Sequence, residues 1–117
     1  SVETTELVAT CIAEEARAIG VHWNWAPVAD INSNPDNPIV NTRSFGETPE
    51  IVSEHAAAYV RGTQACGVMA CVKHVPGHGD THVDSHRDLP TIELEPQIAE
   101  SVSSPPSAAA QKRACAA

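Results

Sequence analysis

The sequence predicts an α/β fold built on a parallel sheet or barrel. Two helix-like segments alternate with two short apolar segments that read as strands, and a long loop follows each strand. Helices that alternate with strands are typical of parallel architectures, in which a helix crosses back to begin the next strand. In such folds ligands bind at the carboxyl ends of the strands. The polar residues that would lie there are Asp30, Arg43, Lys73 and His74.

The first helix and strand are expected at the start of the chain. Residues 4–19 carry apolar side chains at helical spacing, Thr4 or Thr5 can act as the N-cap, and Gly20 ends the helix. The next segment, VHWNWAPV at 21–28, alternates apolar with polar residues and therefore predicts a strand. These two elements would form the first unit of the fold.

The second helix and strand follow a long loop. This loop, residues 31–47, contains four asparagines, and loops of that length in compact domains are usually functional or disordered. Thr48 is the expected N-cap of a helix that has Pro49 at its first position and ends at Gly67. The apolar run VMACV at 68–72 predicts a strand that is buried on both faces.

Composition restricts the class of partner. The chain has 15 acidic against 7 basic residues, a formal charge of −8, which disfavours binding to nucleic acid or to anionic membranes. No apolar run approaches the roughly 18 residues of a transmembrane helix. The four cysteines form no C-x-x-C pair, so we expect buried, reduced thiols. Together with the absence of a visible signal peptide, this favours a cytoplasmic location without deciding it. The cysteines are Cys11, Cys66, Cys71 and Cys115.

Four histidines recur every fourth residue in the stretch KHVPGHGDTHVDSH, residues 73–86. On a helix this spacing would place them on one face, as in a zinc site. Pro76 would cost about 3 kcal/mol inside a helix, and Gly77 and Gly79 about 1 kcal/mol each. The stretch is therefore predicted to be a loop, and no metal ligands are assigned. The histidines are His74, His78, His82 and His86.

Two groups in this region suggest chemistry. Asp84 precedes His86 by two residues, and a carboxylate can hold an imidazole in one tautomer for proton transfer. Lys73 and His74 end a buried strand, where a polar ligand would be a natural partner, and Arg43 could bind ligand hydroxyls. Taken singly, each of these groups also fits an ordinary solvated loop or a surface ion pair.

Two longer patterns resemble a known family. The stretches WAPVADINSNPDNPIVNTRSFGE and KHVPGHGDTHVDSHRDLP, in this order, are similar to the N-terminal catalytic domain of glycoside hydrolase family 3. The D-x-H pair, which β-glucosidase members typically lack, makes the chain resemble the β-N-acetylglucosaminidase branch. The resemblance ends near residue 92. It implies part of a (β/α)8 TIM barrel, about two strand–helix units, over residues 1–94.

The resemblance also implies roles for individual residues. His86 would be the general acid/base and Asp84 its orienting partner, while Arg43, Lys73 and His74 would bind the sugar. In the family the nucleophile is an Asp on a later strand, which would lie outside this chain. No cofactor and no metal are implied, and the partner would be a small saccharide, an N-acetylglucosaminide, rather than nucleic acid or membrane.

The sequence therefore predicts a fragment of a retaining β-N-acetylhexosaminidase that is inactive by itself. Its first residue is Ser1 rather than Met, which also suggests a fragment or a processed chain. Residues 95–117 are dominated by Ser, Pro and Ala and are predicted to be a disordered or aberrant tail. Two alternatives remain open: a histidine-rich metal-binding module and a truncated product without function.

Overall fold

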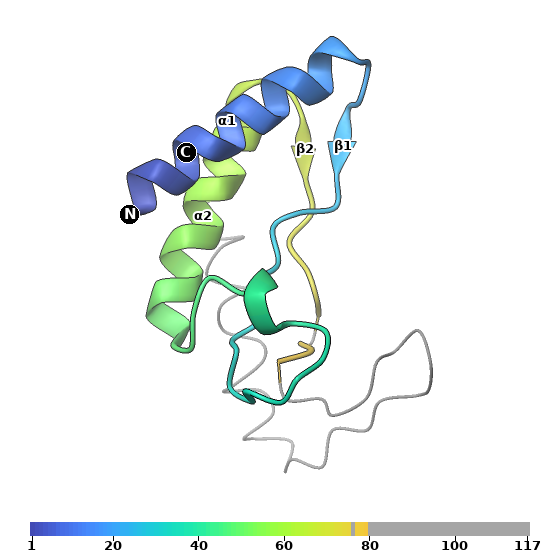
Figure 1. Cartoon of the computed structure of the whole chain (residues 1–117). Coiled ribbons are helices and arrows are strands. Elements are labelled where there is room, and N and C mark those ends of the chain that lie inside the picture. The colour runs from blue at the N-terminus through green and yellow to red at the C-terminus, as the bar shows by residue number, and fades with distance from the viewer. Residues whose placement is uncertain (76, 80–117) are drawn as a thin grey trace.

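A computed structural model of the chain describes residues 1–75 and 77–79. Two short strands lie side by side in it, with a helix before each strand (Figure 1). The strands are parallel and pair Trp23 with Met69, so the predicted α/β class and the parallel direction are confirmed. In chain order the elements are α1 (Val2–Ala18), β1 (Trp23–Asn24), the 3-10 helix η1 (Asn41–Arg43), α2 (Pro49–Ala65) and β2 (Met69–Ala70).

Helix α1 begins earlier than the sequence predicts. Ser1 is the N-cap, and its hydroxyl accepts a hydrogen bond from the backbone N–H of Thr4 at 3.3 Å. The assignment of the cap to Thr4 or Thr5 was wrong because a serine three residues before Thr4 can extend the helix by a further turn. The other end agrees with the prediction: Ile19 is the C-cap, and Gly20 follows with φ of 85°.

The two strands are shorter than predicted because their pairing is interrupted. Asn24 pairs with Ala70, and the next bridge joins Val28 to Lys73. The first segment therefore advances four residues where its partner advances three, so it contains one extra residue, as in a β-bulge. Accordingly, the N–H of Cys71 is shared between the carbonyl groups of Asn24 and Ala26, at 3.1 and 2.9 Å. The two segments of the chain therefore pair over about the predicted length, but in two separate stretches.

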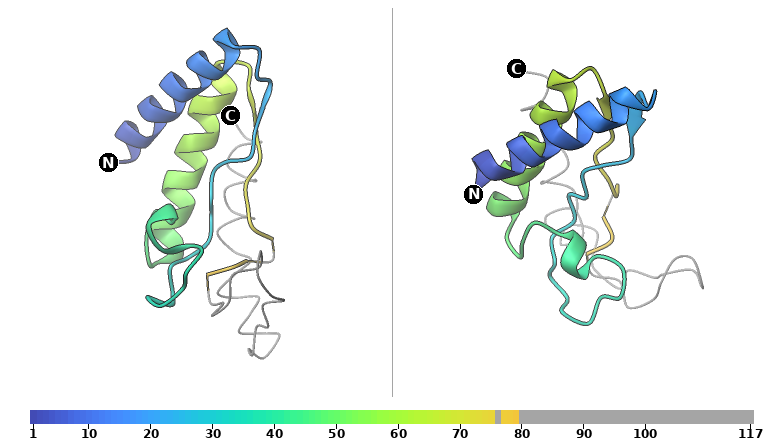
Figure 2. Two further views of the ribbon diagram at one scale, coloured as in Figure 1. Left: turned by 45° about the vertical axis from the view of Figure 1, so that its right-hand side comes forward. Right: turned by 45° about the horizontal axis from the view of Figure 1, so that its top comes forward.

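The prediction that residues 68–72 are buried on both faces was wrong. Val68 is 2% exposed, whereas Met69 is 58% exposed. In the described part of the chain both helices lie on the same side of the strands (Figure 2), so the opposite side has no cover there. Trp23 of β1 and Trp25, the residue just after β1, are also exposed and stack with 4.7 Å between ring centroids.

Helix α2 begins as predicted, with Thr48 as N-cap and Pro49 in the first turn; its last residue is Ala65, and Cys66 is the C-cap. Its inner face joins the start of the long loop, because Val52 and Ala56 form a core cluster with Ala29 and Ile31. This cluster lies just beyond the end of the β1 segment, so it supports the backbone that leaves the strand.

The cysteines are only partly as predicted. The three within the described residues are free thiols, as expected, but none is buried: Cys11 is exposed, and Cys66 and Cys71 are intermediate. Cys11 lies off the buried face of α1, which contains Ala9 and Ala13, and is therefore exposed. Among residues 1–75 and 77–79, no helix is long and apolar enough to cross a membrane.

Helices α1 and α2 approach closely where α2 has a glycine. A Cβ atom on Gly62 would lie 2.4 Å from the backbone oxygen of Glu6 and 3.1 Å from the Cβ of Ala9. Polar contacts flank this point. Arg61 donates to the Oε2 atom of Glu6 at 2.8 Å, and Thr5 contacts the Nδ1 atom of His55 at 2.7 Å.

We therefore expect Gly62→Ala to destabilise the chain. Alanine would normally stabilise a helix interior relative to glycine by about 0.5–1 kcal/mol. Here the added methyl group must push α1 away from α2, and such overpacking typically costs about 1–3 kcal/mol. Urea unfolding should show a lower midpoint for Gly62→Ala, whereas Gln64→Ala, on the exposed side of α2, should change stability by no more than about 0.5 kcal/mol. A midpoint raised by Gly62→Ala would contradict the close packing.

Candidate active site

The carboxyl ends of the two paired segments meet at one end of the sheet. Parallel pairing of Val28 with Lys73 brings Asp30 beside His74, and the N–H of Ala29 donates to the carbonyl of Lys73 at 2.6 Å. The loop over 31–47, which contains η1, lies at the same end (Figure 1). The predicted grouping of polar residues at this edge is thus confirmed for the described residues.

The centre of this edge is a buried carboxylate. The side chain of Asp30 is 0% exposed, and its two oxygens have different partners. Oδ2 lies 2.6 Å from Nδ1 of His74, and Oδ1 accepts a hydrogen bond from the backbone N–H of His78 at 2.7 Å. The backbone oxygen of Asp30 accepts a third bond, from the hydroxyl of Ser44 at 2.7 Å. One residue therefore binds both loops of the site.

A second buried side chain, Asn37, joins the same two loops. Its Nδ2 donates to the carbonyl groups of His78 and Gly79, at 2.7 and 3.0 Å. Its Oδ1 accepts from the N–H groups of Ile39 and Val40, at 2.8 and 2.9 Å. A side-chain amide can donate two hydrogen bonds and accept two, and Asn37 makes at least two of each here. Asn37 therefore shapes its own loop and holds the other one.

The two loops touch at a glycine. A Cβ atom on Gly79 would lie 1.9 Å from the backbone oxygen of Ile31, which no side chain could tolerate without backbone movement. Gly79 therefore does more than disfavour a helix. Its lack of a side chain allows the loop after β2 to lie against the loop after β1.

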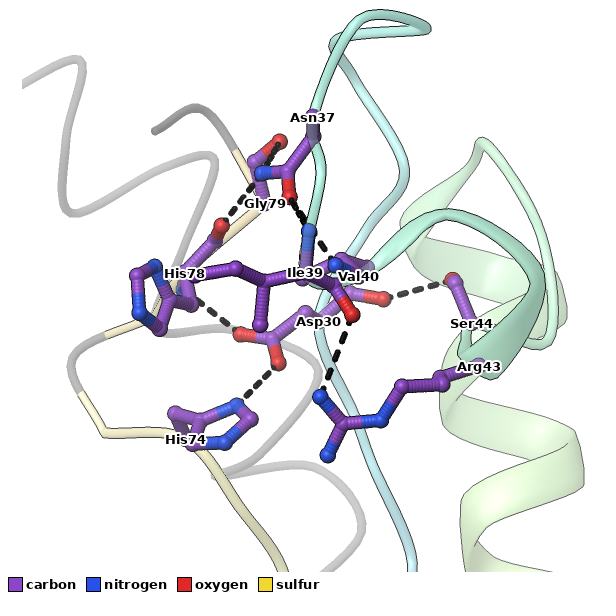
Figure 3. A network of polar contacts seen from close by, with 9 residues as sticks. All are labelled: Asp30, Asn37, Ile39, Val40, Arg43, Ser44, His74, His78 and Gly79. Atoms are coloured by element: carbon purple, nitrogen blue, oxygen red, sulfur yellow. Dashed lines mark hydrogen bonds and ion pairs between the residues drawn. The ribbon is translucent and has the colours of Figure 1, made fainter. Parts of the chain in front are cut away.

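Arg43 and His74 belong to one hydrogen-bonded network (Figure 3). Arg43 is at the end of η1, is exposed, and donates from Nη1 to the carbonyl of Ile39 at 3.1 Å. The backbone of Ile39 is bound by Asn37, Asn37 binds His78, and His78 is bound by Asp30, which holds His74.

Lys73 lies beside this network. Its backbone N–H donates to the carbonyl of Pro27 at 3.0 Å, and its side chain is half-buried. Three predicted site residues, Arg43, Lys73 and His74, are thus placed at one end of the sheet. Asp84 and His86 lie outside the described residues, and their roles stay predictions.

The sequence patterns assign no role to Asp30 or Asn37, although they place Asp30 at the strand end. The sequence did contain a signal for Asp30. This carboxylate follows the predicted strand 21–28, whose parallel partner is followed by Lys73 and His74, so a contact with a ligand or with that partner is expected. Four asparagines in one loop likewise indicate backbone turns held by side chains.

The side chains at this edge are suited to hydroxyl-rich ligands. Among the described residues no group of three or more His, Cys, Asp and Glu could hold a metal ion. The rings of His74 and His78 are edge to face, with centroids 5.4 Å apart, and Nδ1 of His74 contacts Asp30. A lysine and an arginine at this edge can donate to ligand hydroxyls, and a neutral imidazole can both donate to them and accept from them.

Comparison of the sequence with known proteins finds a family whose profile the chain matches. Residues 1–114 match the sequence profile of the glycosyl hydrolase family 3 N terminal domain. "Beta-hexosaminidase A" of Pseudoalteromonas piscicida is 49% identical over 86 residues, which are 74% of this chain and 14% of that protein.

Solved structures agree with this. A glycoside hydrolase family 3 beta-N-acetylglucosaminidase from Paenibacillus sp. str. FPU-7 superposes with a TM-score of 0.92 at 42% identity, over 97% of this chain and 22% of that one. Beta-glucoside phosphorylase BglX bound to 2FGlc gives 0.92 at 32% identity, over 97% and 20%. The chain thus spans less than a quarter of each of these relatives.

We expect Asn37→Asp to destabilise the contact between the two loops. An aspartate keeps the acceptor for the turn but replaces the donor with an oxygen that faces two carbonyl groups, in a position that is 1% exposed. A buried group without its hydrogen bonds costs about 1–3 kcal/mol, and more when charged. Urea unfolding should therefore show a clear loss of stability.

The matched control is Asn41→Asp, the same chemical change at an exposed position of the same loop. Its effect should stay within about 0.5 kcal/mol. Equal midpoints for the two variants would show that the bonds from Asn37 to residues 78 and 79 contribute nothing.

Proposed function

This chain belongs to glycosyl hydrolase family 3, and from that premise we propose that it is part of a retaining β-N-acetylhexosaminidase. The substrate would be a saccharide with a terminal, β-linked N-acetylglucosamine. The observation that carries the proposal is the hydrogen-bonded network that joins Arg43 and His74, next to Lys73, at the carboxyl end of two parallel strands. Relatives named as β-hexosaminidases support the choice of sugar.

We propose that residues 1–94 form about two strand–helix units of a (β/α)8 barrel. The parallel pairing of β1 with β2, with α2 between them in the chain, is the repeat from which such barrels are built. Exposed residues on the uncovered side of the strands, such as Trp23 and Met69, would then face the remainder of the barrel.

The proposed reaction has two steps. In the first, His86 gives its proton to the glycosidic oxygen while the carboxylate nucleophile, which lies outside this chain, bonds to the anomeric carbon and the leaving group departs as an alcohol. In the second, His86 takes a proton from water, whose oxygen displaces the carboxylate and releases the sugar. Asp84 would hold the imidazole in the required tautomer. Arg43, Lys73 and His74 would hold the sugar hydroxyls.

We expect the 117-residue chain alone to hydrolyse no aryl N-acetyl-β-glucosaminide above background. Retaining hydrolysis needs a second carboxylate about 5–5.5 Å from the first catalytic group, and general acid help by itself contributes only about 10²–10⁴-fold. A colorimetric assay with the purified chain tests this. The positive control is a chimera in which residues 1–94 replace the equivalent segment of the Paenibacillus enzyme. Robust turnover by the chain alone would refute the need for an external nucleophile, and an inactive chimera would favour the truncated-product alternative.

In the active chimera, we expect His86→Ala to slow glycosylation of substrates with poor leaving groups by about 10²–10⁴-fold. Activated aryl glycosides should be spared in this step because their leaving group needs little protonation. Pre-steady-state release of the leaving group measures the step directly. His82→Ala, a histidine of the same stretch without an assigned role, is the matched control. Equal losses for both substrate types would remove His86 from the acid role.

Two further measurements separate the alternatives. Adding phosphate to the assay tells hydrolysis from phosphorolysis, which the name of one structural relative suggests, because phosphorolysis yields the sugar 1-phosphate. Titration of the 117-residue chain with zinc tests the metal-binding alternative. Stoichiometric binding at sub-micromolar affinity would favour a metal module over the hydrolase.

A further inference from the structure

The most unusual group in the described residues is the carboxylate of Asp30. Its side chain is 0% exposed, whereas that of its partner His74 is 31% exposed. A carboxylate without solvent must have hydrogen-bond donors, and it has two, Nδ1 of His74 and the N–H of His78. Because it cannot reach a ligand itself, any effect that it has on one must pass through these partners.

The contact determines where the proton of the imidazole lies. An ionised carboxylate can only accept hydrogen bonds, so Nδ1 of His74 must be the donor at 2.6 Å. In the neutral ring Nε2 is then an acceptor. Figure 3 shows Nδ1 turned toward Asp30 and the opposite edge of the ring turned away from it.

We propose that Asp30 is a positioning residue: it fixes the proton of His74 on Nδ1, so that Nε2 is the atom that meets a sugar hydroxyl. This rests on the proposed function, in which His74 binds the sugar. A ring with the opposite tautomer would present an N–H at the same place and would lose the acceptor. The other carboxylate oxygen, bound to the N–H of His78, keeps the group from rotating away from the ring.

The decisive variant is Asp30→Asn, which keeps the size of the side chain and removes one acceptor. The amide oxygen must stay toward the N–H of His78, because an NH2 group there would oppose another donor. The NH2 group therefore faces Nδ1 of His74, which must become an acceptor, and the proton moves to Nε2. The substitution thus inverts the tautomer while leaving the bond to the loop in place.

The matched control is Ser44→Ala. It removes the hydrogen bond from the hydroxyl of Ser44 to the backbone oxygen of Asp30 without changing the carboxylate. Any general loosening of this region should appear in both variants. A change of tautomer should appear only in Asp30→Asn.

The experiment has two readouts. Long-range ¹H–¹⁵N correlation spectra of ¹⁵N-histidine-labelled protein report the protonated ring nitrogen, with His74→Gln identifying the signal. We expect an Nδ1 proton in the unsubstituted sequence and in Ser44→Ala, and an Nε2 proton in Asp30→Asn. The spectra are recorded on the 117-residue chain and on the chimera. The spectrum of the unsubstituted protein by itself tests whether the proton of His74 lies on Nδ1. This part of the test does not require any variant to fold. An Nε2 proton there would overturn the proposal.

The second readout is kinetic and uses the chimera. We expect Asp30→Asn to raise KM about tenfold, the value of one lost hydrogen bond, with a smaller change in kcat. Ser44→Ala should leave KM within about twofold. If Asp30→Asn inverts the tautomer and KM does not change, then His74 does not bind the sugar. In that case the sugar-binding role proposed for His74 is wrong, and Asp30 is not a positioning residue for the substrate. If kcat and stability fall with no change of tautomer, the role of Asp30 is only structural.

Discussion

The site depends on the need of one buried carboxylate for hydrogen-bond donors. Asp30 can exist without solvent only because the loop after β2 supplies an imidazole N–H and a backbone N–H within 2.7 Å. Those donors are available because Val28 and Lys73 pair in parallel, which sets the two strand ends side by side. The bulge between the two paired stretches sets the register of that last bridge. Pairing, register and carboxylate therefore form one arrangement, in which none of the three can change independently.

Most helix ends and the parallel direction of the strands could be predicted from the sequence, whereas the N-cap of α1 and the register of the strand pairing could not. The cap at Thr48 with Pro49 after it, and the glycine after α1, depend on neighbours within one helical turn. The extra residue between Asn24 and Val28 depends on how the second segment aligns with the first, which no pattern within one segment contains. The exposure of Met69 likewise depends on what covers the outer side of the strands.

The same distinction applies to the site. Lys73, His74 and Arg43 could be selected because polar residues at the ends of strands and in long loops are the usual ligand-binding positions. Asp30 and Asn37 act on partners 44 and 41 residues away, so their roles appear only when the loops are placed together. Gly79 shows this most clearly. Its sequence context explains why the stretch is not a helix, but the reason that it must be glycine is the backbone of Ile31.

Burial separates the residues that hold the site from those that can reach a ligand. Asp30 and Asn37 are 2% and 1% exposed, so they can act on a ligand only by fixing other groups. His74 is 31% exposed at its side chain, and Arg43 is exposed, so these are the groups that a sugar could contact. An exposed side chain that contacts a ligand loses conformational entropy on binding unless its orientation is already fixed in the free protein. The hydrogen bond from Asp30 does this for His74. Arg43, which has one bond to a backbone carbonyl, is less constrained and retains more freedom to adjust to the ligand.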